Sequence, residues 1–477
     1  MAEKHVYIEP VTRIEGHAKV SIYLDEKNKV KQARMHVVEF RGFERFVQGR
    51  PYWEVPVLVQ RLCGICPVSH HLAAAKAMDR IVGAKKLTAT AEKVRRLMHY
   101  GQTFQSHAMH FFHLASPDLL FGFDADPAIR NVFGVVQKHP DLAVQAVKMR
   151  AYGQEVIKAT AGKRIHGTGA IPGGVNKNLS LAERDVLLKD VEQMVAWARS
   201  ALGIARDYTT AHLKELAPFG SFDSNHGGIV RKDGTLDLYD GRFRVKDAKG
   251  SMVIDQLDPM KYLDHIAEEV RSWSYMKFPF VKSLGPGKGW YRVGPLARIN
   301  VCDRIDTPEA EAARVEFMKL TDGKPNNITM AYHWARMIEL VHAAEKIRDL
   351  LHDSDLQGAD LVVKGERQFE AVAVIEAPRG TLWHHYRVNE NDQVTMANLI
   401  VSTTQNNEPM NQAVMKVVQD HISGKAEITE GMLNHVEVAI RAYDPCFSCA
   451  THALGQMPLV VELIDVHGNV IEKRGRA

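Results

Sequence analysis

The sequence predicts a mainly α protein with small β-sheets at its periphery, an α+β architecture built around a core of long helices. Apolar residues recur with helical spacing over several long segments, and short alternating segments lie before, between and after them. No internal repeat or low-complexity linker divides the chain. Its 477 residues are enough for one large core or for two to three ordinary domains.

The N-terminal third is expected to contain a hairpin followed by long helices. Alternation predicts strands over 18–25 and 30–40, joined by the polar turn Glu26-Lys27-Asn28-Lys29. Helical spacing then predicts helices at 72–82, 89–115, 140–161 and 180–215. Ser180 is expected to cap the last of these, because a serine side chain accepts hydrogen bonds from the free N–H groups of a first turn.

The rest of the chain alternates between turns, short strands and helices. A stretch rich in Gly and Pro predicts a rigid turn region at 163–177, and short pieces broken by Gly and Asp predict a small sheet within 219–257. Further helices are expected at 308–320, 327–353 and 409–422, and strands over 370–402. The segment 458–472 alternates and predicts a terminal hairpin that turns at His467-Gly468-Asn469.

Composition and charge exclude several classes of protein. The 61 Lys and Arg residues are spread out and nearly matched by 57 Asp and Glu residues, which gives no support to nucleic-acid binding. No apolar signal segment follows Met1, and no run reaches the roughly eighteen apolar residues that a membrane span requires. We therefore expect a cytoplasmic protein without a membrane span.

The placement of the cysteines is informative. Five cysteines are too few for a disulfide framework in a chain of this length. Four of them form two Cys-x-x-Cys pairs at opposite ends of the chain, Cys63/Cys66 and Cys446/Cys449. The fifth, Cys302, stands alone, and we expect it to be a small buried apolar residue.

Two such pairs make a four-sulfur site if the fold brings the chain ends together. Four thiolates are soft ligands that suit zinc, an iron–sulfur cluster, or nickel and iron. Structural zinc sites usually take both pairs from one small module, whereas these pairs lie far apart in sequence. Acid–base residues also surround the pairs, and an inert site has little use for them: Glu15, His70, Arg379, Asp444 and His452. A four-cysteine structural zinc protein remains the alternative.

The motifs around these pairs resemble those of [NiFe]-hydrogenase large subunits. The paired signature is Arg61-x-Cys63-Gly64-x-Cys66-x-x-x-His70 with Asp444-Pro445-Cys446-x-x-Cys449-x-x-His452. The resemblance extends, in the family's order, to Thr12-Arg13-Ile14-Glu15-Gly16-His17, Phe40-Arg41-Gly42-Phe43-Glu44, Val293-Gly294-Pro295-Leu296-Ala297-Arg298 and Glu376-Ala377-Pro378-Arg379-Gly380. It implies that family's fold, with 1–452 as a single catalytic body.

The resemblance implies a nickel ion held by all four thiolates. Cys63 and Cys446 would be terminal ligands, and Cys66 and Cys449 would bridge to an iron that carries CO and CN. H2 would split heterolytically at this centre, with Cys446 taking the proton and Glu15 relaying it. A carboxylate beside a metal thiolate suits that task, because burial brings its pKa nearer to the working pH.

Further roles come from the same resemblance. His70 would direct a ring N–H at a bridging sulfur and so tune the metal. Arg379 would lie over the site toward a cyanide, held there by Asp444. Thr403 would hydrogen-bond a cyanide, although its stretch departs from the family, which has Pro at the position of Ser402 and Trp at that of Gln405.

A second metal and a subgroup are also implied. Glu44, His452 and the main-chain carbonyl of Leu399 would hold magnesium or a similar ion. Ser106 stands where many membrane-linked members have Asp, which favours the cytoplasmic, cofactor-coupled hydrogenases, with an NAD-linked bidirectional enzyme first among them. The open alternatives are an F420-linked or disulfide-reductase-linked hydrogenase, an H2 sensor, and a non-catalytic scaffold like the quinone-site subunit of complex I.

Partners follow from the resemblance as well. The chain has no cysteines left for a cluster, so a small Fe–S subunit, together with flavin/Fe–S diaphorase subunits, is expected to carry the electrons. Nickel-insertion chaperones and an endopeptidase would mature the chain. The endopeptidase would cut between His452 and Ala453 and remove the C-terminal extension 453–477.

Overall fold

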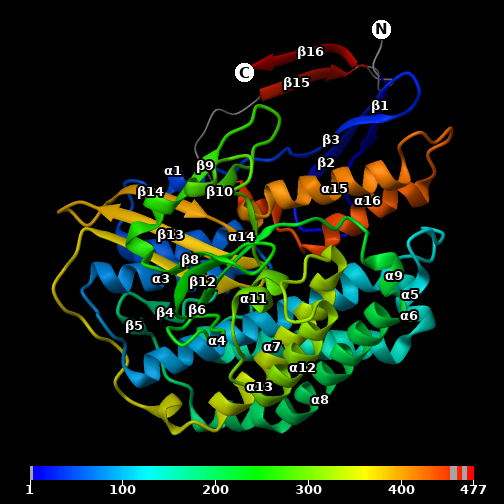
Figure 1. The fold of residues 1–477 in the computed structure, drawn as a ribbon. Helices are drawn as coiled ribbons and strands as arrows, with labels where there is room; N and C mark the ends of the chain where they lie inside the picture. Colours follow the sequence, from blue (N-terminus) through cyan, green and yellow to red (C-terminus); the bar gives the residue numbers. More distant parts are fainter. Residues whose placement is uncertain (1–3, 452–458, 465–469, 477) are drawn as a thin grey trace.

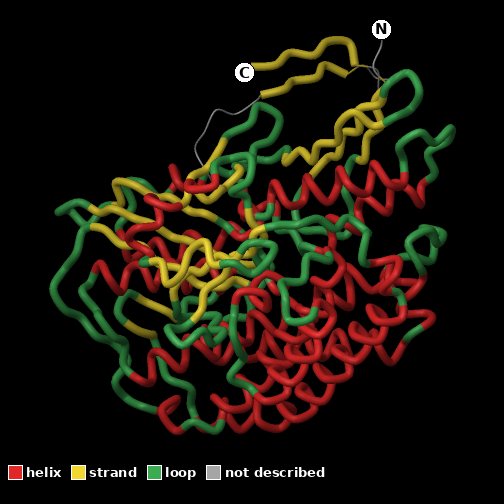
Figure 2. The backbone as a smooth tube through the Cα atoms, viewed as in Figure 1, coloured by secondary structure: helices red, strands yellow, loops and turns green. Residues whose placement is uncertain are grey.

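The computed structural model describes residues 4–451, 459–464 and 470–476. Long helices form its body and small sheets lie beside them (Figures 1 and 2). The helical core is a bundle in which α4 packs on α7 and α13, and α8 packs on α13 and α7. These helices are α4 (Ala89–Met109), α7 (Pro140–Ala161), α8 (Leu181–Ala211) and α13 (Tyr332–Leu351), each within a few residues of its predicted range.

Local sequence explains how the helices begin. Ser180 caps α8 in a full capping box, in which its side chain accepts from the Glu183 N–H and the Glu183 carboxylate accepts from the Ser180 N–H. The predicted helix 89–115 is α4 followed by a π-helical segment, His110–Ala115. Three further predicted helices are present as α3 (Pro67–Ile81), α12 (Pro308–Met318) and α15 (Asn407–His421).

The sheets are small and antiparallel except for one parallel pair. The predicted hairpin is β2 (Ala18–Leu24) paired with β3 (Val30–Val37), and β1 (Lys4–Ile8) adds a third strand. The region 219–257 contains β6 (Asn225–Val230), β7 (Arg242–Lys246) and β8 (Met252–Leu257), with β11 (Tyr291–Arg292) parallel to β6. The third sheet is β12 (Glu370–Ala377), β13 (Gly380–Val388) and β14 (Val394–Ile400). Since β12 and β13 are almost wholly buried and pack on α3, this sheet is part of the core.

Short elements connect these layers. They are α1 (Phe43–Phe46), α2 (Val55–Leu58), α5 (Ser116–Phe121), α6 (Val132–Lys138), α9 (Leu213–Leu216), α10 (Tyr262–His265), α11 (Pro295–Val301), α14 (Ser402–Gln405), α17 (Phe447–Ala450), β4 (Ala170–Ile171), β5 (Gly174–Val175), β9 (Ile266–Glu269) and β10 (Phe278–Val281). One longer helix was not predicted, α16 (Glu430–Ala442), which Thr429 caps by accepting from the Met432 N–H. It packs on α15 and leads directly into the second cysteine pair.

The predicted terminal hairpin is present as β15 (Leu459–Ile464) and β16 (Val470–Arg476), at one end of the molecule (Figure 1). Its predicted turn at 467–469 lies outside the described residues.

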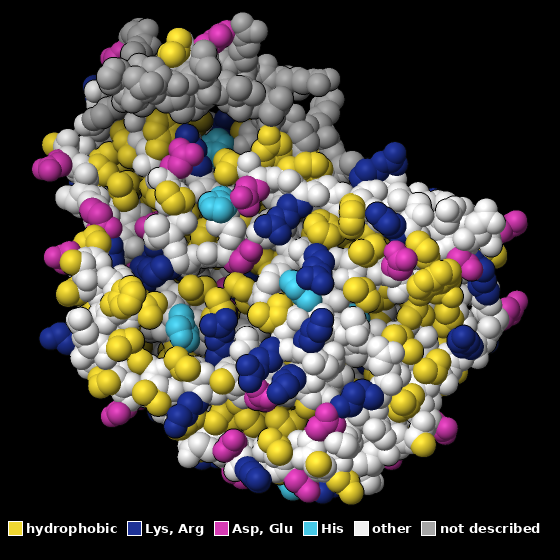
Figure 3. All heavy atoms as spheres, turned by 180° about the vertical axis from the view of Figure 1, so that it is seen from behind, with side chains coloured by type: hydrophobic (Ala, Val, Ile, Leu, Met, Phe, Trp, Pro, Cys, Tyr) yellow, Lys and Arg dark blue, Asp and Glu magenta, His cyan; other side chains and the backbone are white. Residues whose placement is uncertain are grey.

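The two ends of the chain meet beside the core. The Arg41 N–H donates to the Thr451 carbonyl at 2.8 Å, and the Phe447 N–H donates to the Glu15 carbonyl at 3.0 Å. On the face shown in Figure 3, charges of both signs are interspersed with apolar side chains. Among the described helices, none has the length and apolar character needed to cross a membrane.

Candidate metal centre

The first cysteine pair lies at the N-terminus of α3. Cys63 follows a short 3-10 helix, and Cys66 is the N-cap residue before Pro67, the first residue of α3. The tight turn between them directs the Ile65 and Cys66 N–H groups at the Cys63 sulfur, at 3.2 and 3.3 Å. These N–H donors favour a thiolate at Cys63.

The second pair lies in the segment that follows α16. Asp444 takes a left-handed conformation (φ 54°), which turns the chain between α16 and Cys446. Cys446 then pairs with Glu15 in an isolated parallel β-bridge, and Cys449 lies on the single turn of α17. The N-terminal strand region therefore holds the second cysteine pair in place.

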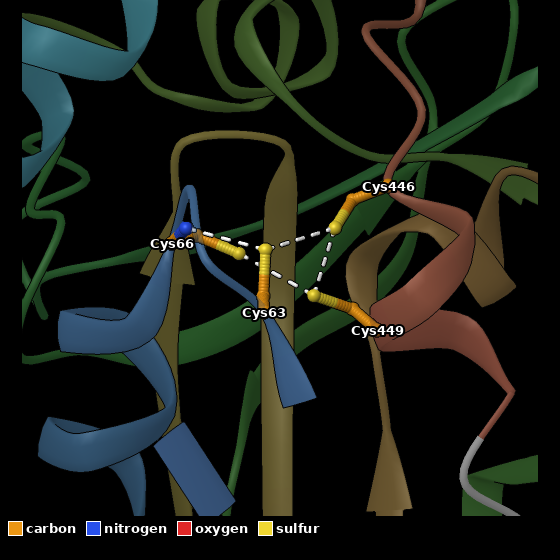
Figure 4. A group of neighbouring side chains, drawn as sticks. All are labelled: Cys63, Cys66, Cys446 and Cys449. Atoms are coloured by element: carbon orange, nitrogen blue, oxygen red, sulfur yellow. Dashed lines mark hydrogen bonds between the residues drawn. The ribbon is translucent and has the colours of Figure 1, made fainter. Parts of the chain in front are cut away.

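The four sulfurs converge on one point. Cys63 Sγ lies 3.3 Å from Cys446 Sγ, Cys66 Sγ lies 3.4 Å from Cys449 Sγ, and Cys446 Sγ lies 2.8 Å from Cys449 Sγ. All four sulfurs lie within 4.8 Å of one another, and all four residues are buried. Figure 4 shows the two pairs pointing toward each other, one from the turn before α3 and the other from the C-terminal segment.

The electrostatics of this cluster favour a bound cation. Burial raises the pKa of Cys446 and of Cys449 well above the usual value for a thiol. The hydrogen bond with Cys446 lowers the pKa of Cys63 well below that value. Four thiolates at these distances would repel one another strongly in a buried site, and a metal ion removes that cost because it keeps its thiol ligands deprotonated.

A small cavity adjoins the sulfurs. Its volume is about 10 Å³, roughly the space that one water molecule needs. Apolar side chains and a few polar ones form its wall, among them Ala377, Pro378, Leu382, Val401 and Ser402. Six residues that the sequence predicted for the site line the same cavity: Cys66, His70, Arg379, Thr403, Cys446 and Cys449.

Arg379 is the charged group of this cavity and sits in the turn between β12 and β13. Its guanidinium donates to Asp444 Oδ1 at 2.9 Å and to the Ser106 hydroxyl at 3.3 Å. Burial opposes the charge, but the Asp444 carboxylate and the neighbouring sulfurs hold the pKa of Arg379 well above its usual value. Its Nε is buried and has no hydrogen-bond partner among the described residues. Arg379 thus remains a cation whose Nε–H donor is unused.

Glu15 and Thr403 both contact the backbone of the segment 446–451, which carries the second cysteine pair and is called the cysteine arm below. Glu15 Oε2 accepts from the Ser448 N–H at 3.1 Å, and Thr403 Oγ1 accepts from the Cys446 N–H at 2.9 Å. Gly16, next to Glu15, has φ 81°, and a Cβ there would lie 2.9 Å from both Phe447 Cβ and Ser448 N. The close approach of the two segments therefore requires glycine. Because Thr403 accepts through its oxygen, its hydroxyl hydrogen can donate elsewhere.

His70 begins a chain of buried polar contacts that leads away from the cavity. Its Nδ1 lies 3.2 Å from His384 Nε2, and His384 Nδ1 lies 2.7 Å from the Tyr386 hydroxyl. His384 and Tyr386 were not anticipated from the sequence. Both lie on the buried strand β13, where nothing in the local sequence distinguishes a histidine beside a metal centre from an ordinary buried one.

The residues proposed for a second metal are only partly described. Glu44 is buried, and its Oε1 accepts from the main-chain N–H of Leu399 at 2.7 Å. The predicted ligand on Leu399 is its carbonyl, whereas the contact that Glu44 makes is with the Leu399 N–H. The other predicted ligand, His452, lies outside the described residues.

Cys302 is buried away from the cluster. Its thiol donates to the Ile299 carbonyl, and burial raises its pKa to about 12. It is a neutral core thiol, which confirms that prediction.

Comparison with known proteins identifies relatives along the whole chain. A family model described as nickel-dependent hydrogenase matches residues 41–128 and 229–452, and a HoxL-like model matches residues 5–40. The NAD-reducing hydrogenase HoxS subunit beta of Cupriavidus necator is 50% identical, over 99% of this chain and 100% of that protein. An F420-non-reducing hydrogenase chain of Methanothermobacter thermautotrophicus is 43% identical, over 98% of this chain and 99% of that protein.

Solved structures agree with these relatives. The crystal structure of an NAD+-reducing [NiFe]-hydrogenase in the H2-reduced state matches with a TM-score of 0.93 and 56% identity, over 95% of this chain and 100% of that one. The Ni-Fe-Se hydrogenase from D. vulgaris Hildenborough matches with a TM-score of 0.77 and 23% identity, over 94% of this chain and 100% of that one, a likeness of fold.

Proposed function

The chain belongs to the nickel-dependent hydrogenases as a large [NiFe]-hydrogenase subunit, and we propose that it is the catalytic subunit of a cytoplasmic, NAD-reducing enzyme. The observation that carries the catalytic assignment is the convergence of four buried sulfurs from the two ends of the chain within 4.8 Å. Soft sulfur donors, a small adjoining cavity and the unused donor on Arg379 Nε fit a nickel–iron centre whose iron carries small ligands.

When bound, this centre would supply the electrophilic metal chemistry that makes H2 acidic enough to split heterolytically. The residues of this chain hold the centre and move the proton. Cys63 and Cys446 would be terminal nickel ligands, and Cys66 and Cys449 the bridging ones. Arg379 and Thr403 would donate hydrogen bonds to cyanide ligands, because each has a donor available at the wall of the cavity. His70 would donate to a bridging sulfur.

The proton would leave through Glu15. Cys446 Sγ would take the proton from H2, and the Glu15 carboxylate would receive it and pass it outward. The β-bridge between Glu15 and Cys446 and the hydrogen bond from the Ser448 N–H hold this carboxylate against the cysteine arm. Such a fixed donor–acceptor pair is what general acid–base catalysis requires.

Electrons would leave through partner subunits. All five cysteines are accounted for, four in the cluster and Cys302 in the core, so the chain has no cysteine set for an iron–sulfur cluster of its own. A small Fe–S subunit, with diaphorase subunits that carry flavin, would pass the electrons to NAD. The names of the relatives at 50% and 56% identity support NAD as the acceptor.

Maturation and the second metal are part of the same proposal. Glu44, the Leu399 carbonyl and His452 would hold magnesium or a similar divalent ion near the end of the catalytic body, residues 1–452. Nickel-insertion chaperones would load the site, and an endopeptidase would remove 453–477.

H2-dependent reduction of NAD+ by the matured, assembled complex tests this proposal. We expect activity with the wild-type chain and with Cys302→Ser, and none with Cys446→Ser. A complex that reduces a viologen dye with H2 but never NAD+ would point to another acceptor.

A further inference from the structure

Two charged residues of α16 hold the loop that carries Glu15. Glu437 Oε1 accepts from both the N–H and the hydroxyl of Thr12, at 2.5 and 2.9 Å. Arg441, one turn later, donates to the Thr12 carbonyl at 3.0 Å and to the Thr12 hydroxyl at 2.9 Å. Thr12 is therefore fixed through its main chain and its side chain by one face of one helix.

Both of these α16 residues are buried, and their charged groups are hydrogen-bonded. Arg441 is 1% exposed and Glu437 is 7% exposed, and their charged groups lie 3.2 Å apart. Arg441 also donates to Asp118 Oδ2 at 3.0 Å and to Asn434 Oδ1 at 2.9 Å. A buried charge is tolerated only where it stays paired and hydrogen-bonded, so these contacts hold Thr12 in a defined position.

The loop that follows Thr12 is constrained at several residues before it reaches the arm. Arg13 has φ 53°, and its guanidinium donates to Asp118 and to the Leu114 carbonyl. Gly16 is pressed against Phe447 and Ser448. Glu15 lies between these two constrained residues, and Thr12 is the residue through which the start of this loop is attached to α16.

The same helix sets the position of the cysteine arm. α16 ends at Ala442, and Cys446 follows four residues later, after the left-handed turn at Asp444. α16 therefore leads into the segment that carries Cys446, and its last turns hold Thr12 in the loop that carries Glu15. The distance between the sulfur and the carboxylate depends on both attachments.

We propose that Glu437 and Arg441 are positioning residues for proton transfer, which hold Thr12 so that the Glu15 carboxylate stays within reach of Cys446. This inference rests on the proposed relay role of Glu15. The step itself moves one proton from the Cys446 sulfur to the Glu15 carboxylate and leaves a thiolate and a carboxylic acid. A displacement of about 1 Å in such a pair lowers the rate by up to roughly a hundredfold.

The test uses the matured complex and two isotope assays. Conversion of para-H2 to ortho-H2 in water reports cleavage and recombination of H2 at the metal centre, whereas D2/H2O exchange also requires the proton to leave the site. We expect Glu437→Ala to slow the exchange about ten- to a hundredfold, with para-H2 conversion and the infrared bands of the metal ligands unchanged. Glu437→Gln, whose amide oxygen can still accept from Thr12, should restore most of the exchange rate.

Matched variants separate the possible outcomes. Glu430→Ala removes another ion-paired carboxylate of α16, the partner of Arg130, and should behave as wild type. If the complex with Glu437→Ala does not assemble, Thr12→Val provides a second test. It removes the hydroxyl that Glu437 and Arg441 hydrogen-bond, leaves the buried charges paired, and should slow the exchange in the same way. Wild-type exchange in Glu437→Ala and in Thr12→Val, with slow exchange in Glu15→Gln, would overturn the positioning role and leave the relay intact. Wild-type exchange in Glu15→Gln itself would overturn the relay and this inference with it.

Discussion

Cys63 and Cys446 are 383 positions apart in the sequence, and their sulfur atoms lie 3.3 Å apart. Closing so long a loop costs conformational entropy, although each doubling of loop length adds only about 0.6 kcal/mol. The contacts of Arg41 with Thr451 and of Glu15 with Phe447 and Ser448 offset this cost from both sides of the arm. The metal centre is thus a tertiary contact as well as a chemical site.

Glu15→Gln should keep the metal centre and lose the proton route. The amide can still accept from the Ser448 N–H, so the arm should stay docked, but it cannot take a proton from Cys446. We expect D2/H2O exchange to fall about a hundredfold or more. The exposed Glu9, which pairs with Lys19 and begins the same loop, provides the control Glu9→Gln. Undiminished exchange in Glu15→Gln would refute the relay.

Cys446→Ser should abolish nickel retention, because a serine hydroxyl is a poor replacement for a soft thiolate ligand. The measurement is nickel per chain after expression with the maturation machinery. Cys302→Ser is the matched control, since that thiol donates to the Ile299 carbonyl in the core, away from the four-sulfur cluster. A fully nickel-loaded, active Cys446→Ser variant would contradict the ligand assignment.

The free energy of unfolding should fall as the pH is lowered, because Glu339 loses its stabilising charge. Burial alone would raise the pKa of this carboxyl, but the charge of Arg298 outweighs burial and lowers it from 4.5 to about 2. Its stabilising contribution is therefore full above pH 4.5 and is lost as the pH falls toward 2. Glu339→Gln leaves the buried Arg298 with Glu376 as its remaining carboxylate partner. We expect this substitution to lower the free energy of unfolding by about 3–5 kcal/mol near pH 7.

Thermal unfolding of the two proteins between pH 7 and pH 3 checks this expectation. The difference in midpoint should shrink as the pH falls below 4.5, because Glu339 then takes up a proton in the unfolded protein, whereas glutamine takes up none. Glu316→Gln, at an exposed position, should show no difference at any pH. A gap that stays constant down to pH 3 would be inconsistent with the lowered pKa.

Maturation should shorten the chain. We expect intact-mass spectrometry of the active complex to show that the large subunit ends at His452, with 453–477 absent. A variant in which Ala453 is replaced by Pro should resist cleavage and remain uncut. An active complex that still carries β15 and β16 would disprove the requirement for processing.

The helical core could be predicted because its signals are local. The apolar spacing of α4, α7, α8 and α13 and the Ser180 cap are read within a few turns of sequence. α16 was missed, because Gly431 follows its first residue and lowers the helix propensity of the first turn. Thr429 as a cap, together with Val436, Ala439 and Ile440, was the available signal.

The site could be predicted only in part. Motif resemblance identified Cys63, Cys66, Cys446 and Cys449, but spacing alone cannot show that the two pairs meet. No sequence pattern indicates the hydrogen bonds of Glu437 and Arg441 with Thr12, because these residues lie 425 and 429 positions from Thr12. The pattern of α16 itself is that of an ordinary amphipathic helix. Long-range polar contacts of this kind are set by tertiary packing.

Infrared spectroscopy with metal analysis of the purified, matured complex tests the central claim most directly. The account predicts about one nickel per chain and sharp bands from metal-bound CO and CN, both lost in Cys446→Ser and kept in Cys302→Ser. A stoichiometric zinc ion with no such bands, in a correctly assembled complex, would contradict it and make the four sulfurs a structural zinc site.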